Sequence, residues 1–101
     1  ALDGRELLPD NFALHENYPN PFNPVTTITY ELPKKILVRL TIFDITGRRI
    51  REIVNGFQEA GFQSALWEGT DDRGQPVSGG LYFYQLKAGE FVETRKMLLI
   101  K

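Results

Sequence analysis

The sequence contains no cysteine, and its 101 residues include only one histidine, one methionine and one tryptophan. The absence of cysteine excludes disulfide frameworks, thiolate zinc sites, iron–sulfur clusters and cysteine nucleophiles. Serine occurs only at Ser64 and Ser78, and neither lies in the Gly-x-Ser-x-Gly turn of serine hydrolases. We interpret the single histidine, His15, as a loop residue rather than a general base paired with Glu16. We therefore expect no catalytic residues, no cofactor and no enzymatic activity.

An excess of charge of one sign is also missing. Twelve Lys and Arg balance thirteen Asp and Glu, for a net charge of −1. This balance argues against a nucleic-acid-binding protein. The longest apolar run, Met97 to Ile100, is far shorter than the ~20 residues that span a bilayer. The first residues lack the pattern of a signal peptide, so we expect any such signal upstream, on a longer parent protein.

Proline and glycine divide the chain into short segments. Residues 1–11 are polar and contain Gly4 and Pro9, which predicts a linker from an upstream domain; residues 12–101 have the composition of one folded domain. Residues 18–24 carry three prolines. Because each proline fixes φ and favours an extended preceding residue, this stretch predicts an ordered extended loop.

Alternating apolar and polar residues predict strands over 25–32, 36–45, 48–54, 62–68, 81–87 and 91–100. The alternation slips within 48–54, which indicates a bulge. Turn signals lie at 33–35, 46–47, 55–56, 60–61, 69–74 and 88–90. Short strands at this spacing predict an all-β fold, an immunoglobulin-like antiparallel β-sandwich of about seven strands.

Two features are compatible with another function, calcium binding or carbohydrate binding. Asp71 and Asp72 are weak candidates for calcium binding, although adjacent carboxylates in a short loop more often cap backbone N–H groups of a turn. Five aromatic residues are candidates for a sugar-stacking surface, although most large aromatics in a domain of this size belong to the core; they are Tyr18, Phe22, Trp67, Tyr82 and Tyr84.

The carboxyl end is unusually apolar. Chains commonly fray into polar tails at their ends, whereas this sequence keeps large apolar residues up to Ile100. This pattern indicates either a firmly paired terminal strand or an end that a partner recognises.

Five motifs in order resemble one family over residues 12–101. They are Asn-Tyr-Pro-Asn-Pro-Phe-Asn-Pro at 17–24, the strand and turn Leu40 to Arg48, Trp-x-Gly-x-Asp-x-x-Gly at 67–74, Ser-Gly-Gly-Leu-Tyr-Phe-Tyr at 78–84 and the closing Lys96 to Lys101. The sequence resembles the type A C-terminal sorting domains of the type IX secretion system and, like many of them, the immunoglobulin-like domain of the flagellar hook-capping protein. His15 and Leu81 are minor departures, since the family often has Gln and Val or Ile there.

The resemblance implies a non-catalytic signal domain that directs a cargo on the same chain across the outer membrane. It implies transit through the periplasm, an extracellular or cell-surface destination, and two partners: the outer-membrane secretion machinery and a sortase-type processing enzyme that cuts before Phe12. Nucleic acid is not expected as a partner. The sequence leaves open whether the domain forms a weak dimer through an edge strand. The alternative is a retained structural or carbohydrate-binding accessory module of an extracellular enzyme.

The resemblance also assigns residues. The expected sorting signal is the closing segment, Lys96, Met97, Leu98, Leu99, Ile100 and Lys101. The expected structural signature is Tyr18, Pro19, Asn20, Pro21, Phe22, Asn23, Pro24, Gly47, Trp67, Gly69, Asp71, Gly74, Gly80 and Tyr82.

Overall fold

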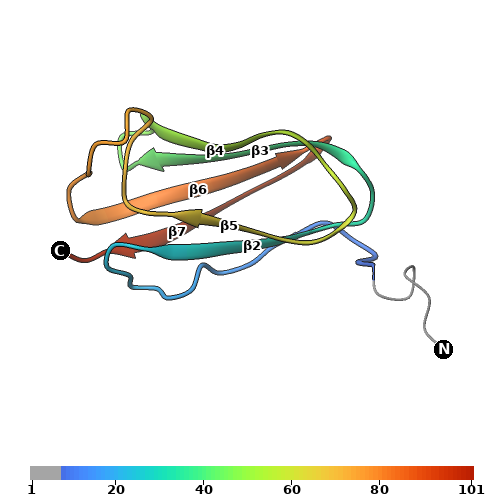
Figure 1. Ribbon diagram of the computed structural model, residues 1–101, viewed down its shortest axis with the longest axis horizontal. Helices are drawn as coiled ribbons and strands as arrows, with labels where there is room; N and C mark the ends of the chain where they lie inside the picture. Colours follow the sequence, from blue (N-terminus) through green and yellow to red (C-terminus); the bar gives the residue numbers. More distant parts are fainter. Residues whose placement is uncertain (1–7) are drawn as a thin grey trace.

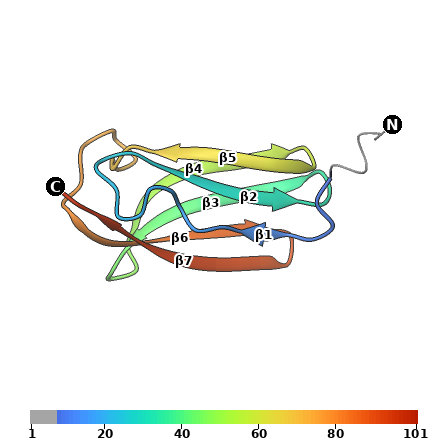
Figure 2. The ribbon, with the colours of Figure 1, turned by 90° about the horizontal axis from the view of Figure 1, so that it is seen from below.

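The protein is an antiparallel β-sandwich. A computed structural model describes residues 8–101, and its elements are the strands β1 (Ala13–Leu14), β2 (Thr26–Leu32), β3 (Ile36–Asp44), β4 (Arg49–Gln58), β5 (Gly61–Trp67), β6 (Gly80–Ala88) and β7 (Phe91–Leu99). A three-stranded sheet has the order β1-β2-β5, and a four-stranded sheet has the order β4-β3-β6-β7. The sheets stack as two layers (Figures 1 and 2). The predicted all-β sandwich of seven strands is confirmed.

The core forms between the two layers because side chains alternate along each strand. On β2 the even-numbered residues are buried and Thr29 is exposed. On β3 the buried set includes Val38, Leu40 and Ile42. The predicted aromatic core residues Trp67, Tyr82 and Tyr84 are all buried. The apolar alternation in the sequence therefore identifies the inner faces of both sheets.

Strand β4 shows both a confirmed prediction and an error. The register between β3 and β4 shifts twice, between Leu40 and Thr41 and between Ile42 and Phe43, as the slipped alternation predicts. The turn expected at Asn55–Gly56 is wrong, because β4 continues through both residues to Gln58. Neither residue has positive φ. Pairing with β3 therefore outweighs the local turn preference of an Asn-Gly pair.

The other predicted turns connect consecutive strands. Gly47 joins β3 to β4 with φ of 85°, and Gly89 joins β6 to β7 with φ of 62°. Both conformations lie in the left-handed region, which glycine adopts without steric cost. Residues 18–24 form the connection between β1 and β2 outside the regular strands, as their prolines predict. All three X–Pro bonds there are cis.

Residues 1–7 of the predicted linker lie outside the described residues. No helix within residues 8–101 is long and apolar enough to cross a membrane.

Candidate functional site

The expected sorting signal forms the end of β7 and the two residues after it. Met97 and Leu99 point into the core and are 1% exposed. Leu98 and Ile100 point outward and are 41% and 49% exposed. Because β7 pairs with β6 alone among the strands, it forms one edge of the four-stranded sheet. Met97 and Leu99 therefore anchor the segment in the core, whereas Leu98 and Ile100 are exposed on its surface.

The proline-rich segment pairs with this terminal strand. The Phe22 N–H donates to the Leu98 carbonyl at 3.0 Å, and the Ile100 N–H donates to the Phe22 carbonyl at 2.8 Å. These bonds make Phe22 a one-residue parallel partner of Leu99 on the outer edge of β7. The Asn20 side-chain oxygen accepts the Leu98 N–H at 3.1 Å. The two ends of the family signature are therefore brought together.

Aromatic rings support the contact from within the core. The ring centroids of Phe22 and Trp67 lie 5.7 Å apart, and those of Trp67 and Tyr82 lie 5.2 Å apart in an edge-to-face arrangement. The Trp67 indole N–H donates to the Thr70 carbonyl at 2.8 Å, which satisfies the polar edge of this buried ring. These contacts join the segment 18–24, the end of β5 and the start of β6.

Two glycines allow the backbone to approach the terminal strand closely. A Cβ atom on Gly69, where φ is 70°, would lie 3.3 Å from the Pro24 carbonyl and 3.5 Å from the Leu99 side chain. A Cβ atom on Gly79 would lie 3.2 Å from the Leu99 carbonyl. The Asn-Pro-Phe-Asn-Pro, Trp-x-Gly and Ser-Gly-Gly motifs therefore converge around Leu99. We call Phe22, Pro24, Trp67, Gly69 and Gly79 the terminal clamp.

Two long side chains hold the segment before the prolines against the other sheet. The Tyr84 hydroxyl accepts the Asn17 N–H at 2.9 Å and donates to the His15 carbonyl at 2.7 Å. The Arg95 Nε donates to the Leu14 carbonyl at 2.8 Å. Burial raises the pKa of Tyr84 to about 12, so the phenol keeps the proton that it donates at neutral pH.

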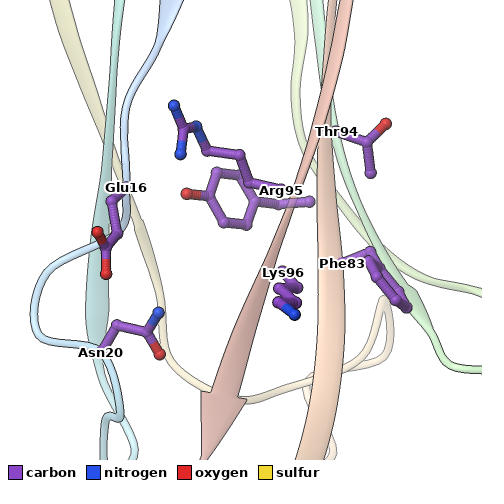
Figure 3. A pocket seen from close by; sticks show the side chains of 7 residues that line it. Glu16, Asn20, Phe83, Thr94, Arg95 and Lys96 are labelled. Carbon is purple, nitrogen blue, oxygen red and sulfur yellow. The ribbon is translucent and has the colours of Figure 1, made fainter.

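A groove of about 500 Å³ lies between this segment and β7. Figure 3 shows Glu16 and Asn20 on one side, Phe83, Thr94 and Lys96 on the other, and the Arg95 side chain between them. Its lining residues are Glu16, Asn20, Phe83, Tyr84, Thr94, Arg95 and Lys96. Lys96 of the expected signal and Asn20 of the signature therefore border one groove.

Asp71 and Asp72 shape the loop between β5 and β6. The Asp71 Oδ1 accepts the N–H groups of Gln75 and Arg73, both at 2.9 Å. The Asp72 carboxylate accepts the Glu52 N–H and pairs with Arg49, both at 3.0 Å. The bond from the Gln75 N–H is the main cause that lowers the pKa of Asp71. The bond from the Glu52 N–H is the main cause that lowers the pKa of Asp72.

Residues 8–101 contain no cluster of three or more His, Asp or Glu arranged to hold a metal ion. Asp71 has the geometry of a capped turn, which Gly74 completes at φ of 80°, whereas the Asp72 carboxylate attaches the loop to β4.

The candidate sugar-stacking rings are separated by burial. Phe22, Trp67, Tyr82 and Tyr84 are inside the sandwich, whereas Tyr18 is 79% exposed. A stacking surface needs several exposed rings in a row, and of these five only Tyr18 offers one. His15 hydrogen-bonds to Glu31 on the neighbouring strand β2.

The remaining signature residues have separate positions. Gly80 opens β6, and Gly47 occupies the β3–β4 turn, at the same end of the sandwich as the C-terminus (Figure 1). Sequence reasoning did not assign Gly79, Tyr84 or Arg95 to holding the terminal and opening segments. Gly79 and Tyr84 lie within the motif at 78–84, which marked them without giving this role, whereas no motif included Arg95.

Comparison with known proteins supports the fold. PorU from Porphyromonas gingivalis, solved as a latent dimer, superposes with a TM-score of 0.72 and 20% identity over 98% of this chain and 10% of its own. PorZ from the same bacterium, described as an essential surface component of the type IX secretion system, superposes with a TM-score of 0.60 and 20% identity over 97% of this chain and 12% of its own. The chain thus spans about a tenth of each protein.

FlgD from P. aeruginosa superposes with a TM-score of 0.58 and 24% identity over 73% of this chain and 57% of its own. No curated protein sequence matches. Residues 22–90, more than half of the chain, match the family described as the FlgD Ig-like domain. The chain belongs to the family of FlgD Ig-like domains.

Proposed function

We propose that this chain is a non-catalytic C-terminal sorting domain, of type A, for the type IX secretion system. In this role it directs a cargo on the same chain through the periplasm and across the outer membrane to the surface or the medium. The observation that carries the proposal is the convergence of the signature motifs on Leu99. A sandwich that served only as a spacer would not need its motifs to converge on the end of β7.

The arrangement suits recognition by a partner. The terminal clamp fixes the backbone of the last strand, so that Lys96, Leu98 and Ile100 project outward from a rigid surface. A rigid surface loses little conformational entropy on binding. The similarity of fold to PorZ, itself described as a component of this secretion system, favours the same setting.

The proposed partners are the outer-membrane secretion machinery and a sortase-type enzyme that cuts before Phe12. In this proposal the chain contributes recognition and no chemistry, as the sequence leads us to expect.

Deletion of residues 97–101 from the parent protein in its native host tests this function. We expect the cargo to accumulate in the periplasm, and normal export of the truncated protein would reject the proposal. Peptide mapping of the exported protein tests the processing step. Loss of peptides from Phe12 onward is expected, whereas their retention would favour a structural accessory module that stays attached.

A further inference from the structure

The middle of β7 has unpaired main-chain groups along its outer edge. The bonds from Phe22 show that the main-chain groups of Leu98 and Ile100 point away from β6. Because this direction alternates along an antiparallel pair, the N–H and C=O groups of Lys96 and Thr94 point the same way. Within residues 8–101, none of these four groups has a hydrogen-bond partner.

This edge lacks two of the features that protect edge strands from pairing, a bulge and a proline. The register between β6 and β7 runs without a bulge from Gly80↔Leu99 to Ala88↔Phe91, and β7 contains no proline. The opposite edge strand, β4, is bulged, and Asp72 covers it through bonds to Ile50 and Glu52. Of these two edges of the larger sheet, β7 is the one that can accept another strand.

The groove in Figure 3 adjoins these unpaired groups. Phe22 already occupies the outer edge of β7 at Leu99, which shows that this edge accepts a parallel partner. We propose, resting on the proposed sorting function, that one extended segment of the export partner adds as a strand to β7 at Thr94–Lys96, inside this groove. Main-chain hydrogen bonds of this kind give affinity, and side-chain contacts give specificity.

The shape of the groove selects a single extended segment over a second copy of this chain. The wall formed by Glu16 and Asn20 lies opposite β7 and limits the width of the groove, which has a volume of about 500 Å³ (Figure 3). The β7 edge of a second copy would bring its own wall and the rest of its sandwich into the same space.

The charge of Lys96, on the outer face of the sheet beside the groove, indicates the chemistry of the partner segment. Lys96 lies opposite Phe83 in the register and has no ion-pair partner within the part of the chain that the structure describes. An added strand would place alternate side chains beside Lys96 on the outer face of the sheet. The partner segment therefore carries an Asp or Glu at that position.

Proline substitution tests the main-chain contact. Thr94→Pro removes an N–H that bonds to nothing within residues 8–101, and proline is tolerated at edge positions whose N–H faces solvent. Thr94→Val loses the same hydroxyl contact with Gln85 and keeps the N–H. In the parent protein, we expect Thr94→Pro to be exported at least about tenfold less than Thr94→Val, with similar melting temperatures.

Ser64→Pro on β5 is the matched control at another edge. Thr27 exchanges main-chain bonds with Tyr18, so β2 bonds to β5 through its even-numbered residues. Ser64, opposite Thr29, therefore also points its N–H away from its partner strand. We expect Ser64→Pro to be exported normally. Equal loss of export from Ser64→Pro and Thr94→Pro would overturn the proposal.

A second variant fills the groove from the other side, in case Thr94→Pro does not fold. Glu16→Trp leaves β7 untouched, and we expect it to be exported at least about tenfold less than Glu16→Ala. Equal export of these two folded variants would overturn the proposal, as would equal export of folded Thr94→Pro and Thr94→Val. If the truncation at residue 97 still blocks export in that case, the sorting function stands and only the edge contact fails.

Analytical ultracentrifugation tests whether a second copy of this chain occupies the β7 edge instead. A dimer of the 101-residue chain that Thr94→Pro converts to a monomer would assign the edge to a second copy and overturn the proposal. We expect both forms to be monomers.

Discussion

Phe22 and Leu99 are parallel main-chain partners, although they lie at opposite ends of the folded sequence. The pairing uses one bond in each direction, from Phe22 N–H to Leu98 and from Ile100 N–H to Phe22. Both side chains are buried, at 2% and 1% exposure. The opening and closing segments of the domain therefore stabilise each other, and a change in one affects the other.

Phe22→Ala tests the energetic weight of this pairing. Removal of a buried phenylalanine leaves a cavity, so we expect the free energy of unfolding in urea to fall by about 3–5 kcal/mol. Tyr18→Ala, at an exposed ring of the same segment, is the control and should change it by less than about 0.5 kcal/mol. Similar effects of the two substitutions would contradict the clamp.

Gly79→Ala tests the close approach to the terminal strand. The new methyl group would meet the Leu99 carbonyl at 3.2 Å, so we expect a loss of about 1 kcal/mol and faster amide hydrogen exchange at Ile100. Gly56→Ala is the control, because a Cβ there meets no atom within 4 Å and φ is not positive. Unchanged exchange at Ile100 in Gly79→Ala would show that the contact does not hold the chain end.

Tyr84→Phe tests the attachment of the opening segment. The buried Asn17 N–H loses its acceptor, so we expect the free energy of unfolding to fall by about 1–3 kcal/mol at neutral pH.

Tyr84 also predicts that the free energy of unfolding falls at alkaline pH. The pKa of Tyr84 rises from 10.0 to about 12 on folding, so the unfolded chain releases this proton first. Stability from this group is complete below pH 10 and is lost as the pH rises towards 12. Tyr84→Phe should weaken this decline without abolishing it, because burial also raises the pKa values of Tyr30 and Tyr82. Urea unfolding across this range measures it, and an identical decline in the variant would contradict the assignment.

Asp71→Asn tests the carboxylate cap of the β5–β6 loop. Hydrogen bonds from Gln75 and Arg73 lower the pKa of Asp71 below 3.8, so its stabilising effect is present above that pH and is lost as the pH falls through the folded value. An asparagine oxygen accepts the same N–H groups but does not titrate. The urea midpoint of Asp71→Asn should therefore depend less steeply on pH below about 4 than that of the parent. An unchanged slope would show that this carboxylate does not couple folding to pH.

The strands could be predicted because their signal is local. The alternation of Ile28, Tyr30 and Leu32 specifies one buried face without knowledge of the rest of the chain. The Asn55–Gly56 prediction failed because an Asn-Gly pair favours a turn only when no neighbouring strand continues alongside it, and β3 does.

The terminal clamp could not be derived from local patterns. Nothing in the residues around Phe22 indicates that its N–H meets Leu98, because that bond joins distant segments. The family motifs identified Phe22, Trp67 and Gly69 as important without giving the reason. The structure supplies it: each lies near the last strand or supports a residue that does.

The most direct test of the sorting function changes the displayed side chains and leaves the anchored ones in place. Leu98→Ser with Ile100→Ser alters two exposed residues and keeps the main-chain bonds to Asn20 and Phe22. Leu37→Ser with Phe57→Ser is the matched control, at two exposed residues on β3 and β4 of the same sheet. Fractionation of the native host should find the parent protein of the first variant in the periplasm and that of the control outside the cell. Export of the first variant to the level of the control would contradict the sorting function of the terminal segment.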